Sequence, residues 1–467
     1  MAQSFDIIVI GSGPGGYTAA IRAAQLGYKT AIVEKYAVLG GTCTNVGCIP
    51  TKALLDGTEL YDMIQHKTEK QGIGYKDLSL DFTKLISRKA TVVKQNNDGI
   101  TYLMKKNKIA VLQGLGSFTS KNEIKVTSEG KEEKYTAKYF IIATGSKPST
   151  IPGVEIDKQR IITSTEALSL KEQPKSVIII GGGVIGVEMA SIYQRIGTKV
   201  TIVEYADHLI PTMDHELGKE LFKLLTKKGI DIFLNCKVQS AKNTGSGASV
   251  SYLDEKGAQQ TATGDYVLVA VGRKAYTEGL GLDKTGIKTD NRGRIETNEK
   301  LQTAEPNIYA IGDVIKGAML AHKAEDEAVF VVDSIHGLKA HVNYHAIPGV
   351  VYTWPEVASV GYTEEELKAS NTPYNKGKFP FTANGKARAA DDTDGFAKVL
   401  TDPKYGEVLG VHIIGARAAD MIAQGVYAIE FELTDTEIAK SPYAHPTFSE
   451  ALKEAFLGAS GRGQLNI

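Results

Sequence analysis

Two copies of one nucleotide-binding pattern constrain the fold of this 467-residue chain. The first copy starts with an apolar stretch, FDIIVI at 5–10, and continues through the glycine run GSGPGG at 11–16 into an Ala-rich helical stretch. A second apolar stretch then ends at Glu34. This order predicts a βαβ unit whose glycine loop holds a dinucleotide pyrophosphate at a helix N-terminus. The GxGxxG positions are Gly11, Gly13 and Gly16, and Glu34 follows the first of them by 23 residues (34 − 11).

The second copy repeats this pattern at residues 176–204. Its glycines are Gly181, Gly183 and Gly186, and Glu204 again lies 23 residues after the first (204 − 181). An acid at this position accepts hydrogen bonds from a ribose 2′-OH and repels a 2′-phosphate. The residues that follow, YADH at 205–208, contain no Arg or Lys. The sequence therefore predicts two dinucleotide sites, and the second favours NAD over NADP.

The duplication extends to a closing strand in each copy, YFIIATGSKP at 139–148 and YVLVAVGRKA at 266–275. From the first fingerprint glycine to the closing glycine there are 134 residues in the first copy (145 − 11) and 91 in the second (272 − 181). The helical segments at 43–108 fill the difference. They read as an insertion into the first nucleotide-binding fold.

Two of the three cysteines, Cys43 and Cys48, begin this insertion in the stretch GGTCTNVGCIPTK. Cys48 with Pro50 reads as a helix start, where a thiolate is stabilised by roughly 0.3–1 kcal/mol. This favours dithiol redox chemistry, although two ordinary buried cysteines would also fit. Lys52 lies on the same predicted helix face as Cys48, or is simply a solvated lysine. Zinc is disfavoured because the spacing is not CxxC.

Composition narrows the classes of function. Lys+Arg and Asp+Glu are equal at 54 each, which argues against nucleic-acid or membrane-surface binding. No apolar run approaches the roughly 18 residues of a membrane helix, and the first residues do not resemble a secretion signal. Three cysteines cannot form a secreted disulfide framework. We therefore expect a globular protein in a reducing, cytoplasmic compartment.

Other chemically active side chains are few. His445 lies in SPYAHPTFSE, and Glu450, five residues on, is placed to orient its ring and raise its basicity. His341 and His345 have metal-ligand spacing but no evident third ligand, so no metal site is expected. Cys236, in the strand-like run DIFLNCKV, is predicted to be a core residue.

Several motifs together resemble the pyridine nucleotide-disulfide oxidoreductases over essentially the whole chain. They are GSGPGG, GGTCTNVGCIPTKALL, ATGS, GGGVIGVE, AIGDV, MLAH, YTWPEVASVG and HPTFSE, in this order. The resemblance implies an enzyme that oxidises dihydrolipoamide with NAD⁺ through FAD and a Cys43–Cys48 redox disulfide. It also implies a homodimer that serves the lipoyl domains of 2-oxo acid dehydrogenase or glycine-cleavage complexes.

The resemblance implies a role for each matching residue. FAD would be bound by Gly11, Gly13, Gly16, Glu34, Thr42, Lys52, Gly114, Ala143, Thr144, Gly145, Ser146, Asp313, Met319, Leu320, Ala321 and His322. NAD would be bound by Gly181, Gly183, Gly186, Glu204 and Gly272. Cys43 would exchange with the substrate and Cys48 would contact the flavin, beside a Lys52–Glu188 pair. His445, oriented by Glu450, would act as the base from the partner subunit.

The implied fold is α/β, glutathione-reductase-like, with two Rossmann-like dinucleotide-binding domains and a C-terminal α+β dimerisation domain. The expected division is an FAD domain at 1–150, an NAD domain at 151–275, a central segment at 276–346 and the interface domain at 347–467.

Three related enzymes and one protein of another class are the alternatives. A glutathione-type reductase would use NADPH and carry Arg after the second acid. A transhydrogenase would lack the cysteine pair, and a mercuric-ion reductase would add a C-terminal pair that GRGQLNI lacks. A purely structural subunit of a multienzyme complex would not need Cys43, Cys48, His445 and Glu450.

Overall fold

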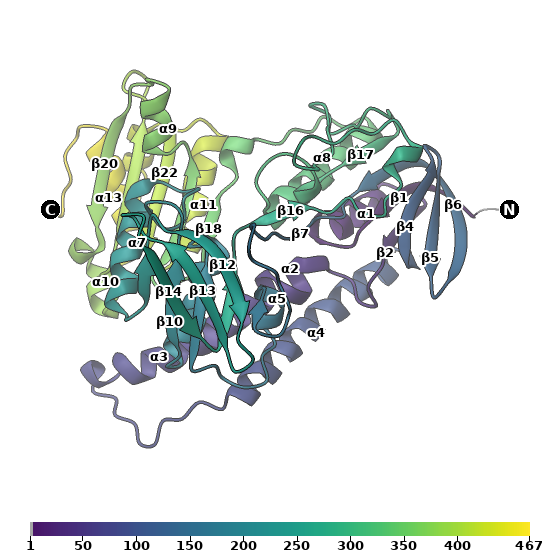
Figure 1. Ribbon diagram of the computed structural model, residues 1–467. Helices are drawn as coiled ribbons and strands as arrows, with labels where there is room; N and C mark the ends of the chain where they lie inside the picture. Colours follow the sequence, from purple (N-terminus) through teal and green to yellow (C-terminus); the bar gives the residue numbers. More distant parts are fainter. Residues whose placement is uncertain (1–2) are drawn as a thin grey trace. The chain divides into compact units, whose positions relative to one another are not determined.

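The computed structural model describes residues 3–467 and divides into two compact units (Figure 1). The first unit contains Met1–Ala53, Ile86–Ser149 and Gly272–Val342. The second contains Leu54–Leu85, Thr150–Val271 and Asn343–Ile467. The four-part domain division expected from the sequence stays a prediction.

The first unit is built on one twisted mixed sheet with the strand order β3-β2-β1-β6-β5-β4, and β17 pairs with β6. The pairs β1–β2, β1–β6, β2–β3 and β6–β17 are parallel, whereas β4, β5 and β6 form an antiparallel meander. These strands are β1 (Gln3–Ile10), β2 (Thr30–Glu34), β3 (Ala110–Gln113), β4 (Leu115–Ser120), β5 (Glu123–Ser128), β6 (Lys131–Ile142) and β17 (Ile308–Ala310). The apolar run of β1 is buried from Ile7 to Ile10, as expected for a central parallel strand.

Helices cover this sheet and carry the predicted cysteine insertion. They are α1 (Pro14–Gln25), α2 (Gly41–Val46), α3 (Cys48–His66), α4 (Phe82–Lys106) and α8 (Ala321–His336), with short 3-10 turns η2 (Leu282–Lys284) and η3 (Gly312–Val314). Helices α3 and α4 each continue into the second unit. A two-stranded ribbon of β7 (Ser146–Pro148) and β16 (Arg273–Ala275) joins the two closing segments of the duplication.

The second unit holds the second nucleotide fold, a parallel sheet of order β11-β10-β9-β15-β8. Its strands are β8 (Ile161–Ile162), β9 (Ser176–Ile180), β10 (Lys199–Val203), β11 (Asp231–Phe233) and β15 (Tyr266–Val269), and its helices are α5 (Ser164–Ala167), α6 (Val184–Arg195) and α7 (His215–Lys227). An antiparallel sheet of β12 (Lys237–Asn243), β13 (Ala248–Leu253) and β14 (Gln259–Gly264) follows β11. Strands β1, β2 and β6 therefore correspond to β9, β10 and β15.

The C-terminal part of the second unit is an antiparallel sheet of order β18-β19-β22-β21-β20. Its strands are β18 (Gly349–Val351), β19 (Glu356–Gly361), β20 (Asn375–Pro380), β21 (Phe396–Thr401) and β22 (Val408–Gly415). The helices are α9 (Glu364–Ala369), α10 (Gly385–Ala390), α11 (Ala418–Glu430), α12 (Asp435–Lys440) and α13 (Glu450–Ala459), and the 3-10 turns are η4 (Tyr344–Ala346) and η5 (Phe381–Ala383). A further 3-10 turn of the second unit, η1 (Glu69–Gln71), follows α3. The α+β texture expected for this part is present.

Two local expectations differ from the structure. Cys236 is buried at 3% exposure, as expected for a core residue, but it lies in the turn between β11 and β12 rather than in a strand. The Cys236 thiol donates a hydrogen bond to the Leu234 carbonyl oxygen at 3.2 Å. Strand β10 ends at Val203, so Glu204 follows the strand instead of closing it. No helix among residues 3–467 is long and apolar enough to cross a membrane.

In the second unit, ion pairs and hydrogen bonds hold the later turns of α3. The Arg195 guanidinium, at the end of α6, donates to the Leu55 carbonyl at 3.1 Å and lies 4.0 Å from the Glu59 carboxylate. Lys228 pairs with Asp62 at 3.1 Å. Burial raises the pKa of Glu59 to about 6; the nearby carboxylates Glu356, Asp56 and Asp392 add to this shift and Arg195 opposes it.

Ionised Glu59 therefore costs stability in the folded chain. Because the folded state holds this proton more tightly, the free energy of unfolding falls as pH rises from about 4.5 to about 6 and stays lowered above that. We expect Glu59→Gln to stabilise the protein by up to about 2 kcal/mol near neutral pH and by nothing below about pH 4.5. Thermal unfolding at both pH values measures this. A Glu172→Gln change on an exposed loop is the control, and an equal gain at both pH values would contradict the assignment.

Candidate active site and dinucleotide sites

The first glycine loop leaves no room for side chains where the backbone must turn. Gly11 has φ +103°, and a Cβ there would stand 2.4 Å from the Ala143 carbonyl oxygen. A Cβ on Gly16 would stand 1.9 Å from the Gly11 carbonyl oxygen, so α1 packs directly on the loop. By contrast, nothing lies within 4 Å of the Cβ position of Gly13. The loop is thus closed toward the protein and open on the side where a ligand would approach.

The N-terminus of α1 has no partner from a side chain. Gly13 is its N-cap, no side chain caps it and no acidic residue lies in its first turn. Helix α6 has the same arrangement at Gly183, and α8 has it at Leu320. Helix α7, in contrast, is capped by Asp214. The free N–H groups of an uncapped helix start form a binding site for a phosphate.

Glu34 is held rigidly at the end of β2. Its carboxylate accepts hydrogen bonds from the Ser12 backbone N–H at 3.1 Å, the Ser12 hydroxyl at 2.6 Å and the Tyr36 N–H at 2.9 Å. The side chain is buried at 6% exposure. The predicted ribose acceptor therefore also fixes the glycine loop that would face the pyrophosphate.

The second site repeats the backbone geometry of the first, without the serine hydroxyl contact. A Cβ on Gly181 would stand 2.5 Å from the Ala270 carbonyl oxygen, and one on Gly186 would stand 2.0 Å from the Gly181 oxygen, while the Cβ position of Gly183 is open. The Glu204 carboxylate accepts hydrogen bonds from the Gly182 N–H and, at 2.6 Å, from the Ala206 N–H. Both sequence fingerprints therefore fold into the same arrangement, a glycine loop and an uncapped helix start held by a carboxylate, which we call a cradle.

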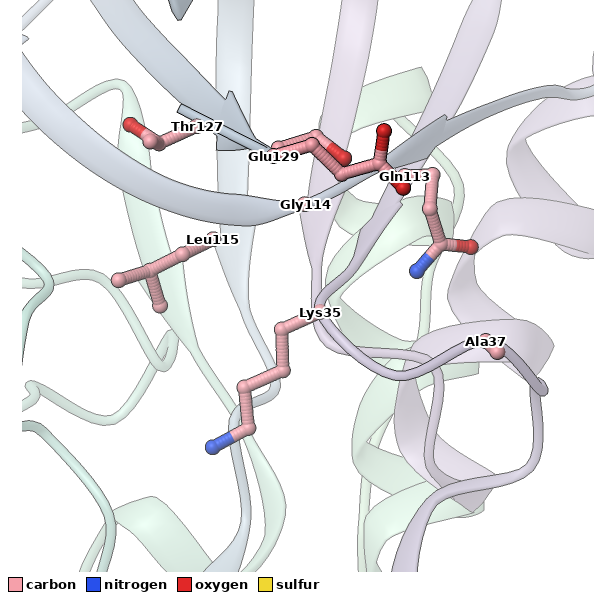
Figure 2. Close-up of a pocket in the computed structure, with 8 residues that line it drawn as sticks. Lys35, Ala37, Gln113, Gly114, Leu115, Thr127 and Glu129 are labelled. Carbon is pink, nitrogen blue, oxygen red and sulfur yellow. The ribbon is translucent and has the colours of Figure 1, made fainter. Parts of the chain in front are cut away.

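A pocket of ≈ 450 Å³ opens beside Glu34 (Figure 2). It is lined by Lys35, Ala37, Gln113, Gly114, Leu115, Thr127, Ser128 and Glu129. Gly114 has φ +142°, and a Cβ there would stand 2.6 Å from the Thr127 carbonyl oxygen. Figure 2 shows the ammonium end of Lys35 extending away from Glu129; it lies 4.0 Å from the centre of the Tyr276 ring. The predicted residue Gly114 thus lines a cavity adjoining the predicted ribose acceptor.

Asp313, predicted from AIGDV, belongs to a small polar network. Its carboxylate accepts a hydrogen bond from the Ser146 hydroxyl at 2.5 Å. Arg273 donates to that hydroxyl and to the Ser146 carbonyl, each at 2.7 Å. Burial lowers the pKa of Arg273, and the Asp313 charge opposes this. Arg273 was not predicted from the sequence. The available signal was the run GRKA at 272–275, which begins with the closing glycine.

Neighbouring predicted positions are fixed by the backbone. Thr144 donates its hydroxyl to the Tyr276 carbonyl at 2.7 Å, and the Gly145 carbonyl accepts from the Tyr276 N–H at 2.9 Å. Gly272 has φ +102°, and its carbonyl accepts from the Ser149 N–H at 3.0 Å. These contacts lock the closing segments on either side of the β7–β16 ribbon.

A buried ion pair supports the turn that carries Asp313. Lys323 and Glu327, at 1% and 0% side-chain exposure, pair at 2.7 Å one turn apart on α8. Glu327 also accepts a hydrogen bond from the Gly312 N–H at 2.7 Å. The pair therefore orients η3 and the start of α8, where Met319, Leu320, Ala321 and His322 were predicted to meet FAD. Sequence reasoning missed this pair, whose signal was the i,i+4 Lys–Glu spacing after MLAH.

The cysteine helix α2 lies directly on the first glycine loop. The Gly40 N–H donates to the Ser12 carbonyl at 3.0 Å, and a Cβ on Gly41 would stand 2.6 Å from Gly13 Cα. Thr42 is exposed in the first turn of α2. This contact places the redox candidates next to the predicted pyrophosphate cradle.

Cys43 and Cys48 are reduced thiols that interact with each other. Cys43 is half-buried in α2 and Cys48 is the first residue of α3, as expected for a thiol at a helix start. The hydrogen bond to Cys48, followed by burial and the Cys48 charge, raises the pKa of Cys43, whereas Lys52 lowers it. Cys43 therefore holds its proton more tightly than an ordinary thiol does, while Cys48 stands at the start of α3, a position that favours a thiolate.

His445 and Glu450 form the predicted dyad in the second unit. His445 Nδ1 lies 2.8 Å from Glu450 Oε1, and the other carboxylate oxygen accepts a hydrogen bond from the Thr447 N–H at 2.8 Å. Burial acts to raise the pKa of Glu450, but the Thr447 and His445 contacts lower it overall. The ring is 78% exposed and its Nε2 side is turned away from Glu450.

Some predicted partners belong to different units. Glu188 is buried on α6 of the second unit and accepts a hydrogen bond from the Tyr352 N–H at 3.0 Å, while Lys52 belongs to the first unit. Their expected pairing stays a prediction, as does the approach of His445 to the cysteines. Within residues 3–467, no group of three or more His, Cys, Asp or Glu side chains is arranged to hold a metal ion.

Two sequence models match the chain, one for "Pyridine nucleotide-disulphide oxidoreductase" over residues 5–328 and one for its dimerisation domain over residues 347–456. The chain belongs to the pyridine nucleotide-disulphide oxidoreductase family. This confirms the predicted family, the α/β fold class with a C-terminal dimerisation domain, and an oxidoreductase as the class of enzyme. The dimerisation domain supports the homodimer expected from the sequence.

Curated relatives and solved structures agree with this family. The chain is 47% identical to "Dihydrolipoamide dehydrogenase" of Chaetomium thermophilum, covering 96% of this chain and 90% of the relative. It is 47% identical to "Dihydrolipoyl dehydrogenase, mitochondrial" of Caenorhabditis elegans, covering 98% and 93%. A structure of the HOCl-induced flavoprotein disulfide reductase RclA from Escherichia coli shares the fold at TM-score 0.86 and 29% identity, covering 98% and 99%.

The cradles fit the cofactors of this oxidoreductase family, FAD and NAD. Each has an open glycine at an uncapped helix start and a hydrogen-bonded carboxylate after the second strand. The ≈ 450 Å³ pocket lies next to the first cradle in the chain, since its lining includes Lys35, the residue after Glu34.

The open Cβ position of Gly183 generates a direct test. Because nothing lies within 4 Å of that position, Gly183→Ala should leave the thermal midpoint nearly unchanged. The new methyl group would occupy the path of the pyrophosphate, so we expect at least about tenfold weaker ADP-ribose binding by calorimetry, or about 1.4 kcal/mol. Bound FAD is the internal control and should be retained. Unchanged ADP-ribose affinity would show that the cradle does not bind the nucleotide this way.

Proposed function

We propose that the chain is a dihydrolipoyl dehydrogenase, which oxidises dihydrolipoyl groups to lipoyl disulfides with NAD⁺ as acceptor. The relatives from Chaetomium thermophilum and Caenorhabditis elegans carry this activity in their names and match nearly the whole chain. The observation that carries the proposal is the Cys43–Cys48 pair, laid by Gly40 and Gly41 on the first glycine loop. A dithiol pair beside a dinucleotide cradle is suited to exchanging electrons between a thiol substrate and a nucleotide cofactor.

The chemistry of the cysteines follows from thiol–disulfide exchange. In the oxidised enzyme, one substrate thiolate attacks Cys43 Sγ, which forms a mixed disulfide and releases Cys48 as the thiolate leaving group. The second substrate thiolate then attacks the substrate sulfur of the mixed disulfide, which closes the substrate disulfide and releases Cys43. Substrate loses two electrons and two protons, and the cysteine pair gains two electrons. The half-buried Cys43 with its raised pKa takes one proton, while Cys48 stands at the start of α3, where a helix N-terminus favours a thiolate.

His445 is proposed as the base that removes the substrate proton. Glu450 holds Nδ1 at 2.8 Å, so that Nε2 is the nitrogen available to a thiol. The 78% exposure of His445 within one chain supports a site completed by a second subunit. Bound FAD would take up the electron pair from the dithiol and deliver it to NAD⁺.

The residues in the cradles are proposed to bind and orient. Ser12, Gly13 and the first turn of α1 face the FAD pyrophosphate, with Glu34 accepting from the ribose. Glu204 does the same for NAD, and the absence of Arg or Lys in 205–208 favours a free 2′-hydroxyl. The Ser146–Asp313–Arg273 network and Lys323–Glu327 shape the remaining wall of the FAD site.

The partners and the compartment are part of the proposal. The activity suits the lipoyl domains of 2-oxo acid dehydrogenase or glycine-cleavage complexes, in a reducing compartment. We expect the cytoplasm from the sequence, but relatives from Arabidopsis thaliana and Pisum sativum are named mitochondrial, so fractionation must decide.

Steady-state kinetics tests the activity. The purified holoenzyme should reduce NAD⁺ with dihydrolipoamide at least about a hundredfold better, in kcat/KM, than it reduces NADP⁺, because Glu204 opposes a 2′-phosphate. Better turnover with glutathione disulfide and NADPH would make it a glutathione-type reductase, the alternative for this chain.

His445→Ala separates the base from the rest of the machinery. We expect dihydrolipoamide turnover to fall by about 10²–10⁴, the range of general acid–base catalysis. Reduction of bound FAD by NADH should persist, since it does not need this base. Stopped-flow absorbance of the flavin measures both half-reactions.

Subunit mixing provides the control for this variant. A randomly reassorted equal mixture of His445→Ala and Cys48→Ser subunits should regain about a quarter of wild-type turnover, since about half of the dimers are heterodimers and one of the two shared sites in each is intact. No recovery on mixing would place the base and the cysteines of each site in one chain.

A further inference from the structure

A loop in the second unit connects the NAD cradle to the C-terminal sheet. We name residues 205–214 the strap. It starts after Glu204, whose carboxylate binds the glycine loop, and ends at Asp214, the N-cap of α7. Leu209, Ile210 and Asp214 are completely buried, so these residues tie the strap to the core, although Tyr205, Asp207, Pro211 and Thr212 are exposed.

The strap packs on the middle glycine of the fingerprint. The Ile210 N–H donates to the Gly182 carbonyl at 2.9 Å, and a Cβ on Gly182 would stand 2.6 Å from Leu209 Cδ2. On the other side, a Cβ on Gly218 of α7 would stand 2.4 Å from the Leu209 carbonyl oxygen. The strap is therefore wedged between the glycine loop and α7, and a shift of the strap would shift the loop.

Ile210 is held in a strained conformation. Its φ of +48° lies in the left-handed region, which is sterically unfavourable for a β-branched residue. Such strain persists only where the surrounding structure determines the conformation more strongly than the residue does. The contacts of Ile210 with Gly182 are one such constraint. The other is the anchor at the far end of the strap.

That anchor is a buried lysine of the dimerisation-domain sheet. Lys398 on β21 is 0% exposed, and its ammonium lies 2.9 Å from both Asp214 carboxylate oxygens. It also donates to Glu364 at 2.6 Å and Glu216 at 3.1 Å. Asp214 in turn accepts hydrogen bonds from the Glu216 and Glu364 N–H groups, each at 3.1 Å. The start of α7 is thus bonded to both β21 and α9.

The charges at the anchor are stable over the working pH range. Burial acts to raise the pKa of Asp214, but His412 and Lys398 lower it overall. Burial acts to lower the pKa of Lys398, but Glu364 and Asp214 raise it overall. A buried, hydrogen-bonded pair of this kind is weakly screened by salt and positions its partners strongly.

We propose that Lys398 is a positioning residue for the pyridine nucleotide: from the dimerisation-domain sheet it holds Asp214, and through the strap it keeps the Gly181–Gly183 loop in its binding conformation. The inference rests on the proposed function in one respect, that the second cradle binds NAD. Without the anchor, the strap can relax Ile210 out of its strained conformation and withdraw its support from Gly182.

The matched test compares Lys398→Met with Lys376→Met. Lys376 contacts the same carboxylates, Glu216 and Glu364, at 3.3 Å, but it is 39% exposed on β20 and does not contact Asp214. For the holoenzyme of Lys398→Met we expect the KM for NAD⁺ and the dissociation constant for ADP-ribose to rise by at least about fivefold, the lower end of measured coupling between sites. The KM for dihydrolipoamide and the rate of dithiol-driven flavin reduction should stay within about twofold. Lys376→Met should match wild type in every measurement.

A second variant covers the case in which Lys398→Met does not fold, because removing one partner leaves Asp214 buried and unpaired. The double change Asp214→Asn with Lys398→Met removes both charges and keeps a residue that caps helices well. Glu216 retains Lys376 and Lys378, and Glu364 retains Lys368 and Lys376. We expect this variant to show the same selective loss of ADP-ribose affinity.

The outcomes separate the inference from the function on which it rests. Wild type that fails to bind ADP-ribose or NAD⁺ would overturn the proposed NAD site. Wild type that binds them, with both Lys398 variants folded and binding equally well, would overturn only the role of Lys398. An equal rise in the KM for dihydrolipoamide would also overturn it, since that would indicate general loosening of the fold.

Discussion

The rest of this structure depends on one local constraint: behind each glycine loop a helix begins without a side chain to cap its N-terminus. Helices α1 and α6 both start at a glycine with an open Cβ position and without a side-chain cap. Their first N–H groups therefore require a ligand, and phosphate satisfies them. A carboxylate after the second strand, Glu34 or Glu204, ties down each loop by its own backbone hydrogen bonds. The side chain proposed to bind the ribose thus also stabilises the cradle.

The redox chemistry is built onto the first of these cradles. Gly40 and Gly41 let α2 lie against the glycine loop, so that the thiols follow directly from the nucleotide fold. The hydrogen bond to Cys48 and burial raise the pKa of Cys43, whereas Cys48 stands at the start of α3, and this difference matches their unequal proposed roles. The second cradle is supported differently. Its strap is strained at Ile210 and anchored by Lys398, which links nucleotide binding to the sheet of the dimerisation domain.

Much of the fold and of the candidate site could be predicted from the sequence, because the patterns that specify them span few residues. Glycine spacing, the acids 23 residues on, the helix start at Cys48 and the His445–Glu450 dyad are all local in sequence or repeated along it. The core position predicted for Cys236 is confirmed, although the residue lies in the segment between β11 and β12 rather than in a strand. Arg273 was missed because its role depends on a contact with Ser146, which is distant in the sequence. The Lys323–Glu327 pair was missed because its contact with Gly312 forms only on folding.

By itself, the sequence determined the two cradles, the thiol pair and the family, because backbone sterics permit few residues other than glycine at these positions and helix starts follow local rules. Only the tertiary structure decided that Cys43 keeps the proton, that a buried pair holds the turn of Asp313, and that Lys398 reaches Asp214. These properties depend on desolvation and on charges brought together from distant segments. A buried lysine in a strand looks in sequence like any surface lysine, and only packing shows that its charge is enclosed and used.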